Sequence, residues 1–166
     1  MEPKTPKQSR VEMTEIVLPT HTNRFGTVFG GQITAWIDIA GGVAAMRHAG
    51  SLAVTASMDQ LHFLHGAKTG DIVVLRAQVN YAGRTSMEVG VRVDSENPIT
   101  GEQHHTATAY LTFVAVDEEG QPRAVPALEP ITEDERRRHE KARRRREQRL
   151  ADRREAVERA RRKGDV

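Results

Sequence analysis

The chain of 166 residues contains no cysteine. Disulfide bridges, thiolate metal sites and a cysteine nucleophile are therefore excluded, and the composition fits a reducing compartment. Aromatic residues make up only 4% of the chain. No apolar run approaches the roughly 20 residues that a helix needs to span a bilayer, and the polar N-terminus lacks the apolar core of a secretory signal. From these absences we expect a cytoplasmic protein without a membrane span.

Charge is distributed unevenly, although the formal net charge is only +2. Residues 1–130 hold 10 Lys and Arg against 14 Asp and Glu, and residues 131–166 hold 15 against 9. The body is therefore mildly acidic and the tail basic, so the high pI does not make the whole protein a nucleic-acid binder. We expect a disordered arm at residues 1–11, one domain at 12–130, and a basic tail, helical or partly disordered, at 131–166.

The body is predicted to contain one strand, one helix and then four strands. The predicted strands are Glu12–Leu18, Ala53–Phe63, Asp71–Tyr81, Ser86–Asp94 and His104–Val116. Alternation of apolar and polar residues places one face of a strand on a core. Because turn residues separate the last four strands, we expect an α+β fold in which a five-stranded antiparallel sheet curls around one central helix.

The predicted helix, Gln32–His48, has an unusual second face. Its apolar stripe at 3.6-residue periodicity comprises Ile33, Trp36, Ile37, Ala40, Ala44 and Arg47. The other face holds the small residues Ala35, Gly42 and Ala45 around the helix's only acidic residue, Asp38. Small residues permit another backbone to approach closely. We therefore expect this helix to be buried on nearly all sides, with a partly desolvated carboxylate.

The tail begins with a capping box, Thr132-Glu133-Asp134-Glu135, and continues to Lys163 without glycine or proline. Acid-then-base pairs four residues apart, such as Glu140 and Arg144, each stabilise a helix by roughly 0.2–0.5 kcal/mol. Its arginine clusters can bind RNA, an acidic membrane or an acidic partner. A solvated charged helix is the simpler interpretation, and we favour it.

The segment from Asn23 to Asp38 combines residues that can carry chemistry. Gly30 and Gly31 precede the predicted helix, where unpaired N–H groups and partial positive charge favour an oxyanion. Asp38 can act as a general base or a nucleophile, and Asn23 can hold a water or a carbonyl. The structural alternatives are a solvent-facing Asp, a turn Asn and glycines that serve close packing. These residues alone do not identify a reaction.

The residues His21–Asp38 closely resemble the signature of hotdog-fold acyl-CoA thioesterases, above all the brain-type acyl-CoA hydrolases and their bacterial single-hotdog counterparts. Similar blocks follow in the same order at Val54–Asp59, Thr69–Asp71, Gly83–Val89 and Ala109–Ala115, and the resemblance ends near Leu128. It implies a hotdog fold and the hydrolysis of acyl-CoA thioesters to a carboxylic acid and CoA. A non-catalytic protein that binds acyl-CoA is the alternative.

The resemblance also assigns roles to residues. Asn23 of one subunit and Asp38 of the other would form a site at a dimer interface, and the N–H groups of Gly30 and Gly31 would polarise the thioester carbonyl. Substrate contacts are expected from His21, Thr22, Phe29, Arg84, Thr85 and Ser86, the last three in a turn suited to the CoA phosphates. The acyl tunnel would include Trp36, Met58 and Phe63. A trimer of dimers is implied, with no metal or redox cofactor.

One loop departs from the family pattern. Where relatives usually have a proline after the second strand, this chain has His65-Gly66, so the path of that loop is not carried over. Histidines gather near it, at positions 62, 65, 104 and 105. Their spacing matches no standard ligand set, so we expect no metal site there.

Overall fold

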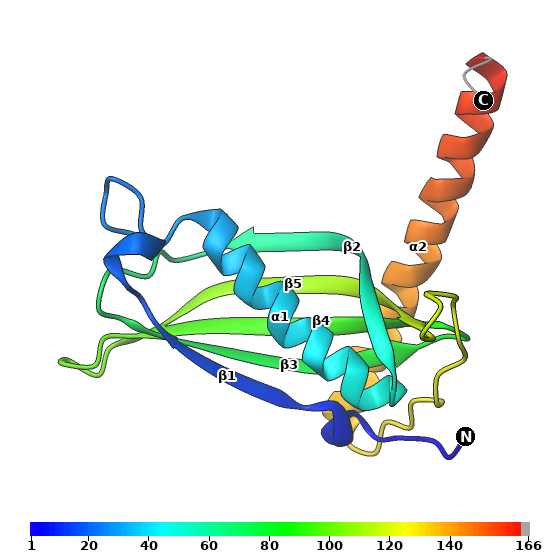
Figure 1. Cartoon of the computed structure of the whole chain (residues 1–166), viewed down its shortest axis with the longest axis horizontal. Coiled ribbons are helices and arrows are strands. Elements are labelled where there is room, and N and C mark those ends of the chain that lie inside the picture. The colour runs from blue at the N-terminus through cyan, green and yellow to red at the C-terminus, as the bar shows by residue number, and fades with distance from the viewer. Residues whose placement is uncertain (164–166) are drawn as a thin grey trace. The chain divides into compact units, whose positions relative to one another are not determined.

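The computed structural model describes residues 1–163, which divide into one compact unit, Met1–Glu129, and a second that starts at Pro130. The first unit is a five-stranded antiparallel sheet with one long helix, α1, across its face (Figure 1). The strand order is β1-β3-β4-β5-β2. The elements are β1 (Val11–Ile16), α1 (Gly30–Ala49), β2 (Leu52–Phe63), β3 (Ile72–Ala82), β4 (Ser86–Glu96) and β5 (Gln103–Val116), with short 3-10 turns at Pro6–Ser9 and Pro19–His21. The predicted hotdog arrangement is confirmed.

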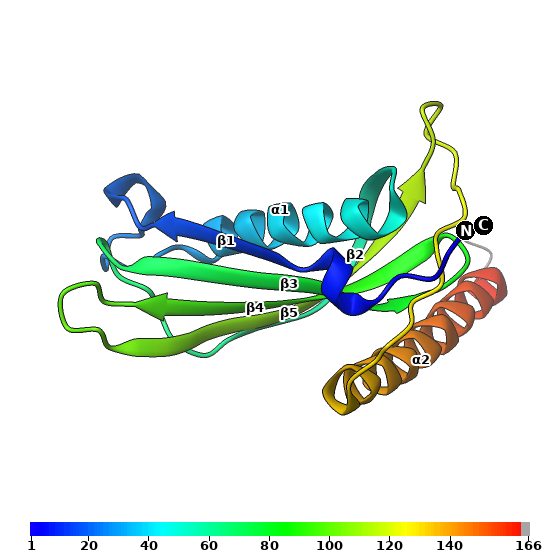
Figure 2. The same cartoon turned by 90° about the horizontal axis from the view of Figure 1, so that it is seen from below.

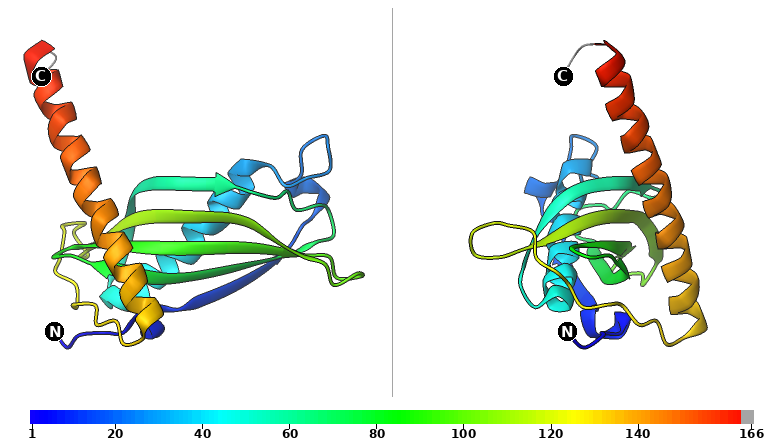
Figure 3. Two further views of the ribbon diagram at one scale, coloured as in Figure 1. Left: turned by 180° about the vertical axis from the view of Figure 1, so that it is seen from behind. Right: turned by 90° about the vertical axis from the view of Figure 1, so that its right-hand side faces the viewer.

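The core lies between α1 and the concave face of the sheet, which curves around the helix when seen from below and end-on (Figures 2 and 3). Alternate residues of the central strands point into it. They are Val73, Leu75, Ala77 and Val79 of β3, Met87, Val89, Val91 and Val93 of β4, and Ala107, Ala109, Leu111, Phe113 and Ala115 of β5. Gly41 of α1 lies directly over Phe113, where an added Cβ would be only 3.1 Å from the ring. Small residues thus let the helix approach the sheet closely.

The helix is buried on one side only within a single chain. Ile33, Trp36 and Ile37 are buried as predicted, but Ile39 and Met46 are 55% and 37% exposed. The predicted stripe also ends differently, because His48 is buried and Arg47 is exposed. The expectation of a helix buried on nearly all sides is therefore wrong for one chain, and an apolar strip remains uncovered.

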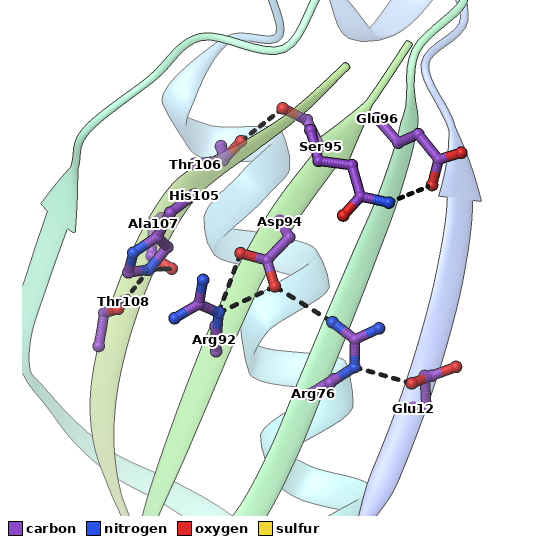
Figure 4. Close-up of polar contacts among 11 residues, drawn as sticks. Glu12, Arg76, Arg92, Asp94, Ser95, Glu96, His105, Thr106, Ala107 and Thr108 are labelled. Carbon is purple, nitrogen blue, oxygen red and sulfur yellow. Dashed lines mark hydrogen bonds and ion pairs between the residues drawn. The ribbon is translucent and has the colours of Figure 1, made fainter. Parts of the chain in front are cut away.

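The convex face of the sheet is polar. Arg76 of β3 donates to Glu12 of β1 at 2.8 Å and to Asp94 of β4 at 3.1 Å, and Arg92 donates to the same Asp94 at 2.9 Å (Figure 4). Both arginine side chains are more than half exposed, so each pair contributes at most about 1 kcal/mol. This network gives the sheet a hydrophilic outer face opposite the core.

The first eleven residues are ordered, which corrects the expectation of a disordered arm. Lys4 forms backbone hydrogen bonds with Ala127 and Glu129, and its ammonium group donates to the carbonyls of Arg47 and His48 at 2.9 Å each. It therefore satisfies carbonyls that the end of α1 leaves unpaired, where a cation is also favoured by the helix dipole. The buried Ser9 hydroxyl accepts the N–H of Val79. Hydrogen bonds of polar residues fix the arm to the rest of the domain, and composition alone does not predict these bonds.

The second unit contains α2 (Glu133–Lys163). Its predicted capping box is confirmed: the N–H of Glu135 donates to the Thr132 hydroxyl at 3.2 Å, and the N–H of Thr132 donates to the Glu135 carboxylate at 3.1 Å. The expected pair of Glu140 with Arg144 forms at 3.1 Å. Hydrogen bonds from Arg143 and Arg144 lower the pKa of Glu140 to about 2. Much of the charge of α2 is thus paired along the helix itself.

His48 is a buried histidine that should make folding sensitive to pH. Its Nε2 donates to the Pro126 carbonyl at 2.9 Å, and its Nδ1 has no partner among the described residues. Burial lowers the pKa of His48 from its ordinary value of 6.5; the hydrogen bond to Pro126 opposes this shift, and the charge of Lys4 adds to it.

As the pH falls through about 6.5, the unfolded chain therefore binds a proton at His48 before the folded chain does, and the free energy of unfolding falls. Denaturant titrations at several pH values should show this loss, and His48→Gln should remove that part of it. An unchanged pH dependence in His48→Gln would contradict this assignment.

Candidate active site

The loop that leads into α1 is held by its own hydrogen bonds. The His21 ring packs edge-on against Trp36 at 5.1 Å, and its Nδ1 accepts the N–H of Leu18 at 3.2 Å. The Thr22 hydroxyl donates to the Pro19 carbonyl at 2.8 Å. Both polar groups are thus engaged within the chain. His21 and Thr22, predicted as substrate contacts, fix the shape of this loop.

Asn23 is exposed at the base of a tight turn. Its Oδ1 accepts the N–H of Phe25 at 2.9 Å and the hydroxyl of Thr27 at 3.2 Å, and its own N–H donates to the Thr27 carbonyl. The side-chain oxygen is therefore committed to the turn. Within residues 1–163 the Nδ2 group has no acceptor, so Asn23 is arranged to donate a hydrogen bond outward.

The first turn of α1 offers free donors, as the sequence predicts. Phe29 is the N-cap residue, no side chain caps the helix, and no acidic residue lies in the first turn. Among the described residues the N–H groups of Gly30 and Gly31 have no acceptor, and both glycines are exposed. An added Cβ at Gly31 would lie 2.5 Å from the Phe29 ring. The glycines thus leave room for an anionic oxygen at the positive end of the helix.

Asp38 lies half-buried further along α1 and has one firm partner. The hydroxyl of Thr55, on β2, donates to its Oδ1 at 2.6 Å. This bond fixes the carboxylate and leaves Oδ2 for another ligand. Thr55 was not identified from the sequence, because a threonine on a strand gives no signal until the strand is placed beside the helix.

A single chain does not bring these groups together. Asp38 follows Gly30 by eight residues, which separates them by about 12 Å along the helix axis. A carbonyl oxygen held by Gly30 and Gly31 is therefore out of reach of the Asp38 of the same chain. A site that uses both groups requires a second copy.

The turn at Arg84, Thr85 and Ser86 lies at the other end of the sheet. It joins β3 to β4, and backbone bonds fix it: Thr85 accepts the N–H of Ala115 at 2.9 Å and Arg84 accepts that of Val125 at 3.0 Å. The side chain of Arg84 is exposed, with no ion pair among the described residues. The loop before α1 lies beside the opposite end of β3, where the N–H of Val17 donates to the Asp71 carbonyl, and a strand as long as β3 separates its two ends by roughly 33 Å.

A cavity of about 350 Å³ opens beside the helix start. It is lined by Val28, Gly30, Ile33, Phe63, Leu64, His65, Gly66, Ala67 and Thr106. Of the three tunnel residues that the family resemblance suggests, only Phe63 lines it, whereas Trp36 is buried in the core. The cavity is mainly apolar and shares Gly30 with the donors of α1.

The described residues contain no group of three or more His, Cys, Asp or Glu side chains that could hold a metal ion. Of the helices in this part of the chain, none is long and apolar enough to cross a membrane.

Comparison with known proteins identifies the family. The model of the thioesterase superfamily matches residues 25–102. An uncharacterized acyl-CoA thioester hydrolase of Bacillus subtilis is 43% identical over 129 residues, which is 78% of this chain and 75% of that protein. A solved apo-hexameric acyl-CoA thioesterase is 46% identical, with a TM-score of 0.88 over 91% of this chain and 97% of the other.

A second group of similar structures comes from one enzyme, the acyl-CoA hydrolase of Staphylococcus aureus. Its complex with butyryl-CoA, CoA and CoA disulfide is 40% identical to this chain, with a TM-score of 0.86 over 93% of this chain and 94% of the other. Further structures of that enzyme replace one Asn, one Asp and one Thr by Ala. In that enzyme the Asp follows the Asn by 15 positions and the Thr follows the Asp by 17. The same two intervals separate Asn23, Asp38 and Thr55 in this chain.

The fold, the glycine-rich start of α1 and these matches agree with one another. The chain belongs to the acyl-CoA thioester hydrolases of the thioesterase superfamily.

Proposed function

We propose that the protein hydrolyses acyl-CoA thioesters to a carboxylic acid and CoA, at a site shared by two copies of the chain. The N–H groups of Gly30 and Gly31 bind the thioester carbonyl oxygen. Asp38 of the partner copy removes a proton from water, which attacks the carbonyl carbon. The C–S bond then breaks, and the proton passes to the departing sulfur of CoA.

The hydrogen bond from Thr55 to Asp38 is the observation that carries this proposal. A solvent-facing Asp has no need of a fixed carboxylate, whereas a general base must hold one oxygen towards the water. With Oδ1 bound at 2.6 Å, Oδ2 is the oxygen that accepts the proton. Asn23 donates through Nδ2 and so orients the water or the substrate. Direct attack by Asp38 on the carbonyl, through an anhydride, uses the same geometry.

The unpaired edge of β2 provides the contact between the two copies. β2 lies at one end of the sheet order, so its outer edge has no neighbour. Leu52, Val54 and Phe63 on this strand are each at least half exposed, beside the exposed Ile39 of α1. A long apolar edge strand is unstable in isolation, and pairing with a second copy of itself satisfies its N–H and C=O groups.

Antiparallel pairing of two β2 edges also completes the site. Gly30 lies against Phe63 at the end of β2, while Asp38 is bonded to Thr55 in the first half of the strand. Two-fold symmetry places the first half of one β2 beside the second half of the other. Asp38 of the partner copy therefore approaches Gly30 of this one.

The same symmetry brings the CoA-binding turn into reach. The turn at Arg84 lies at the Leu52 end of the sheet, since Ser86 pairs with Val114, and Val114 pairs with Val54. Pairing therefore carries the partner's turn towards the Gly30 end of this chain. Its guanidinium, hydroxyls and backbone N–H groups suit the phosphates of CoA.

The proposal extends to the larger assembly, the need for a cofactor and the location of the protein. We propose that the dimers assemble in threes, as the apo-hexameric relative and a hexameric thioesterase of Yersinia pestis support. The proposed reaction needs no metal or redox cofactor, because a carboxylate and helix N–H groups supply the base and the oxyanion donors. The absence of cysteine fits a cytoplasmic location.

Release of free thiol from an acyl-CoA tests the function directly. Asp38→Asn keeps the shape of the side chain but removes the base, and should lower kcat by at least about 100-fold. Full activity in Asp38→Asn would contradict the mechanism. Binding of acyl-CoA in calorimetry without any thiol release by the wild type would instead show a non-catalytic binding protein.

Thr55→Val separates positioning from chemistry. It removes the hydrogen bond to Asp38 while keeping a β-branched residue on the strand, and should lower kcat by about 10-fold with little change in KM. Thr14→Val, an exposed position on β1 at the opposite edge of the sheet, is the matched control and should behave as the wild type. Equal kinetics in both variants would show that the Thr55 bond has no role in turnover.

A further inference from the structure

The second half of α2 differs from the first half in how its charges are paired. In the first half, Glu140 forms ion pairs with Arg143 and Arg144 at 3.0 and 3.1 Å. We name residues 150–162 the distal segment, which Figure 1 draws from orange to red; among the described residues, none of its side chains forms an ion pair. Every residue of the distal segment is exposed except Ala160, which is half-buried. Its arginines are therefore available to a partner outside the chain.

The side chains of the distal segment divide into two faces. Successive residues of an α-helix are turned by about 100°, so residues three, four and seven apart share a face. One face, named here the basic face, spans about 100° of the circumference and comprises, in order around the helix, Arg153, Val157, Leu150, Arg161 and Arg154. The opposite face holds Arg159 and Arg162 with all three acidic residues of the segment, Asp152, Glu155 and Glu158. The basic face thus carries three positive charges and no negative charge.

Two apolar side chains lie at the centre of the basic face. Leu150 is 36% exposed and Val157 is 45% exposed, and the seven residues between their positions make about two turns of helix. Arginines flank this apolar pair on both sides. An apolar centre with cations on its flanks and acidic residues on the far side is typical of a helix that lies flat on a membrane surface.

We propose that the basic face binds the surface of a membrane that contains anionic lipids. Leu150 and Val157 enter the boundary between the headgroups and the acyl chains, and the three guanidinium groups beside them bind lipid phosphates. Asp152, Glu155 and Glu158 face water, away from the negative charge of the lipids. The distal segment is about 18 Å long and inserts only two large apolar side chains, so its binding is shallow and reversible.

Nucleic acid and a second copy of α2 fit the basic face less well. Proteins that bind single-stranded nucleic acid stack the bases on aromatic side chains, and the distal segment contains no aromatic residue. A phosphate backbone alone leaves Leu150 and Val157 in water. Pairing two basic faces would place arginines against arginines, because neither face has a carboxylate. Of these partners, only an anionic lipid surface takes up both the apolar pair and the arginines.

Sedimentation of the full-length protein with lipid vesicles tests this inference. Vesicles of phosphatidylcholine and phosphatidylglycerol in a two-to-one ratio should bind the wild type, and vesicles of phosphatidylcholine alone should not. Replacing Arg153, Arg154 and Arg161 together by Gln should weaken binding by about 100-fold, because each cation near an anionic surface contributes about fivefold. Replacing Leu150 and Val157 together by Gln should weaken binding by at least about fivefold, through the lost apolar burial.

The matched control replaces Arg144, Arg159 and Arg162 together by Gln. These residues lie on the face opposite the basic face, so the control removes the same charge from the wrong side. At a salt concentration of about 0.15 M the Debye length is about 8 Å, which is less than the roughly 10 Å across an α-helix. The control should therefore bind vesicles within about fivefold of the wild type. Circular dichroism and thiol release without vesicles should match the wild type in all variants, which shows that they fold.

A wild type that does not bind the anionic vesicles, or an equal loss in the basic-face variant and the control, would overturn this inference and leave the proposed function standing. RNA retention that depends on the three arginines but not on Leu150 and Val157, without vesicle binding, would identify nucleic acid as the partner instead. A protein that binds vesicles as expected but cleaves no acyl-CoA would refute the proposed function and leave this inference standing.

Discussion

The rise of an α-helix is the constraint on which the rest of this protein depends. Gly30 and Asp38 share one rigid element, and eight residues of helix hold them about 12 Å apart. No change of side-chain rotamer closes that distance. Under the proposed mechanism, the oxyanion donors and the acidic group that act on one substrate therefore come from two different chains, and catalysis requires self-association.

The features of the single chain that look incomplete are consistent with that requirement. The edge of β2 is long, apolar and unpaired, α1 leaves Ile39 and Met46 uncovered, and the Arg84 turn lies at the wrong end of the sheet for its expected ligand. The proposed two-fold axis across β2 would cover the apolar strip of α1, pair the free edge of β2 and bring the Arg84 turn of the partner towards the start of α1. The stability of the assembly and the geometry of the site would then have a common origin.

Local patterns allowed much of this fold to be predicted. Strict alternation in β3 and β4 and the capping box at Thr132 are short-range signals, and each element lies within a few residues of its expected range. Long-range contacts were missed. His48 is buried, rather than Arg47, because Pro126 supplies a carbonyl for its ring; Lys4 is fixed by the last carbonyls of α1; and Thr55 meets Asp38 only through the placement of β2. In each case the partner is distant in sequence, so no periodicity encodes it.

The sharing of the site between two chains can be measured by mixing two inactive variants. Chains carrying Asn23→Ala and chains carrying Asp38→Ala are unfolded together and refolded at equal concentration. Half of the resulting dimers then pair one chain of each kind, and one of the two sites in each mixed dimer has both residues intact. The account predicts recovery of about a quarter of the wild-type thiol release. A mixture as inactive as its components, although mixed dimers form, would contradict it.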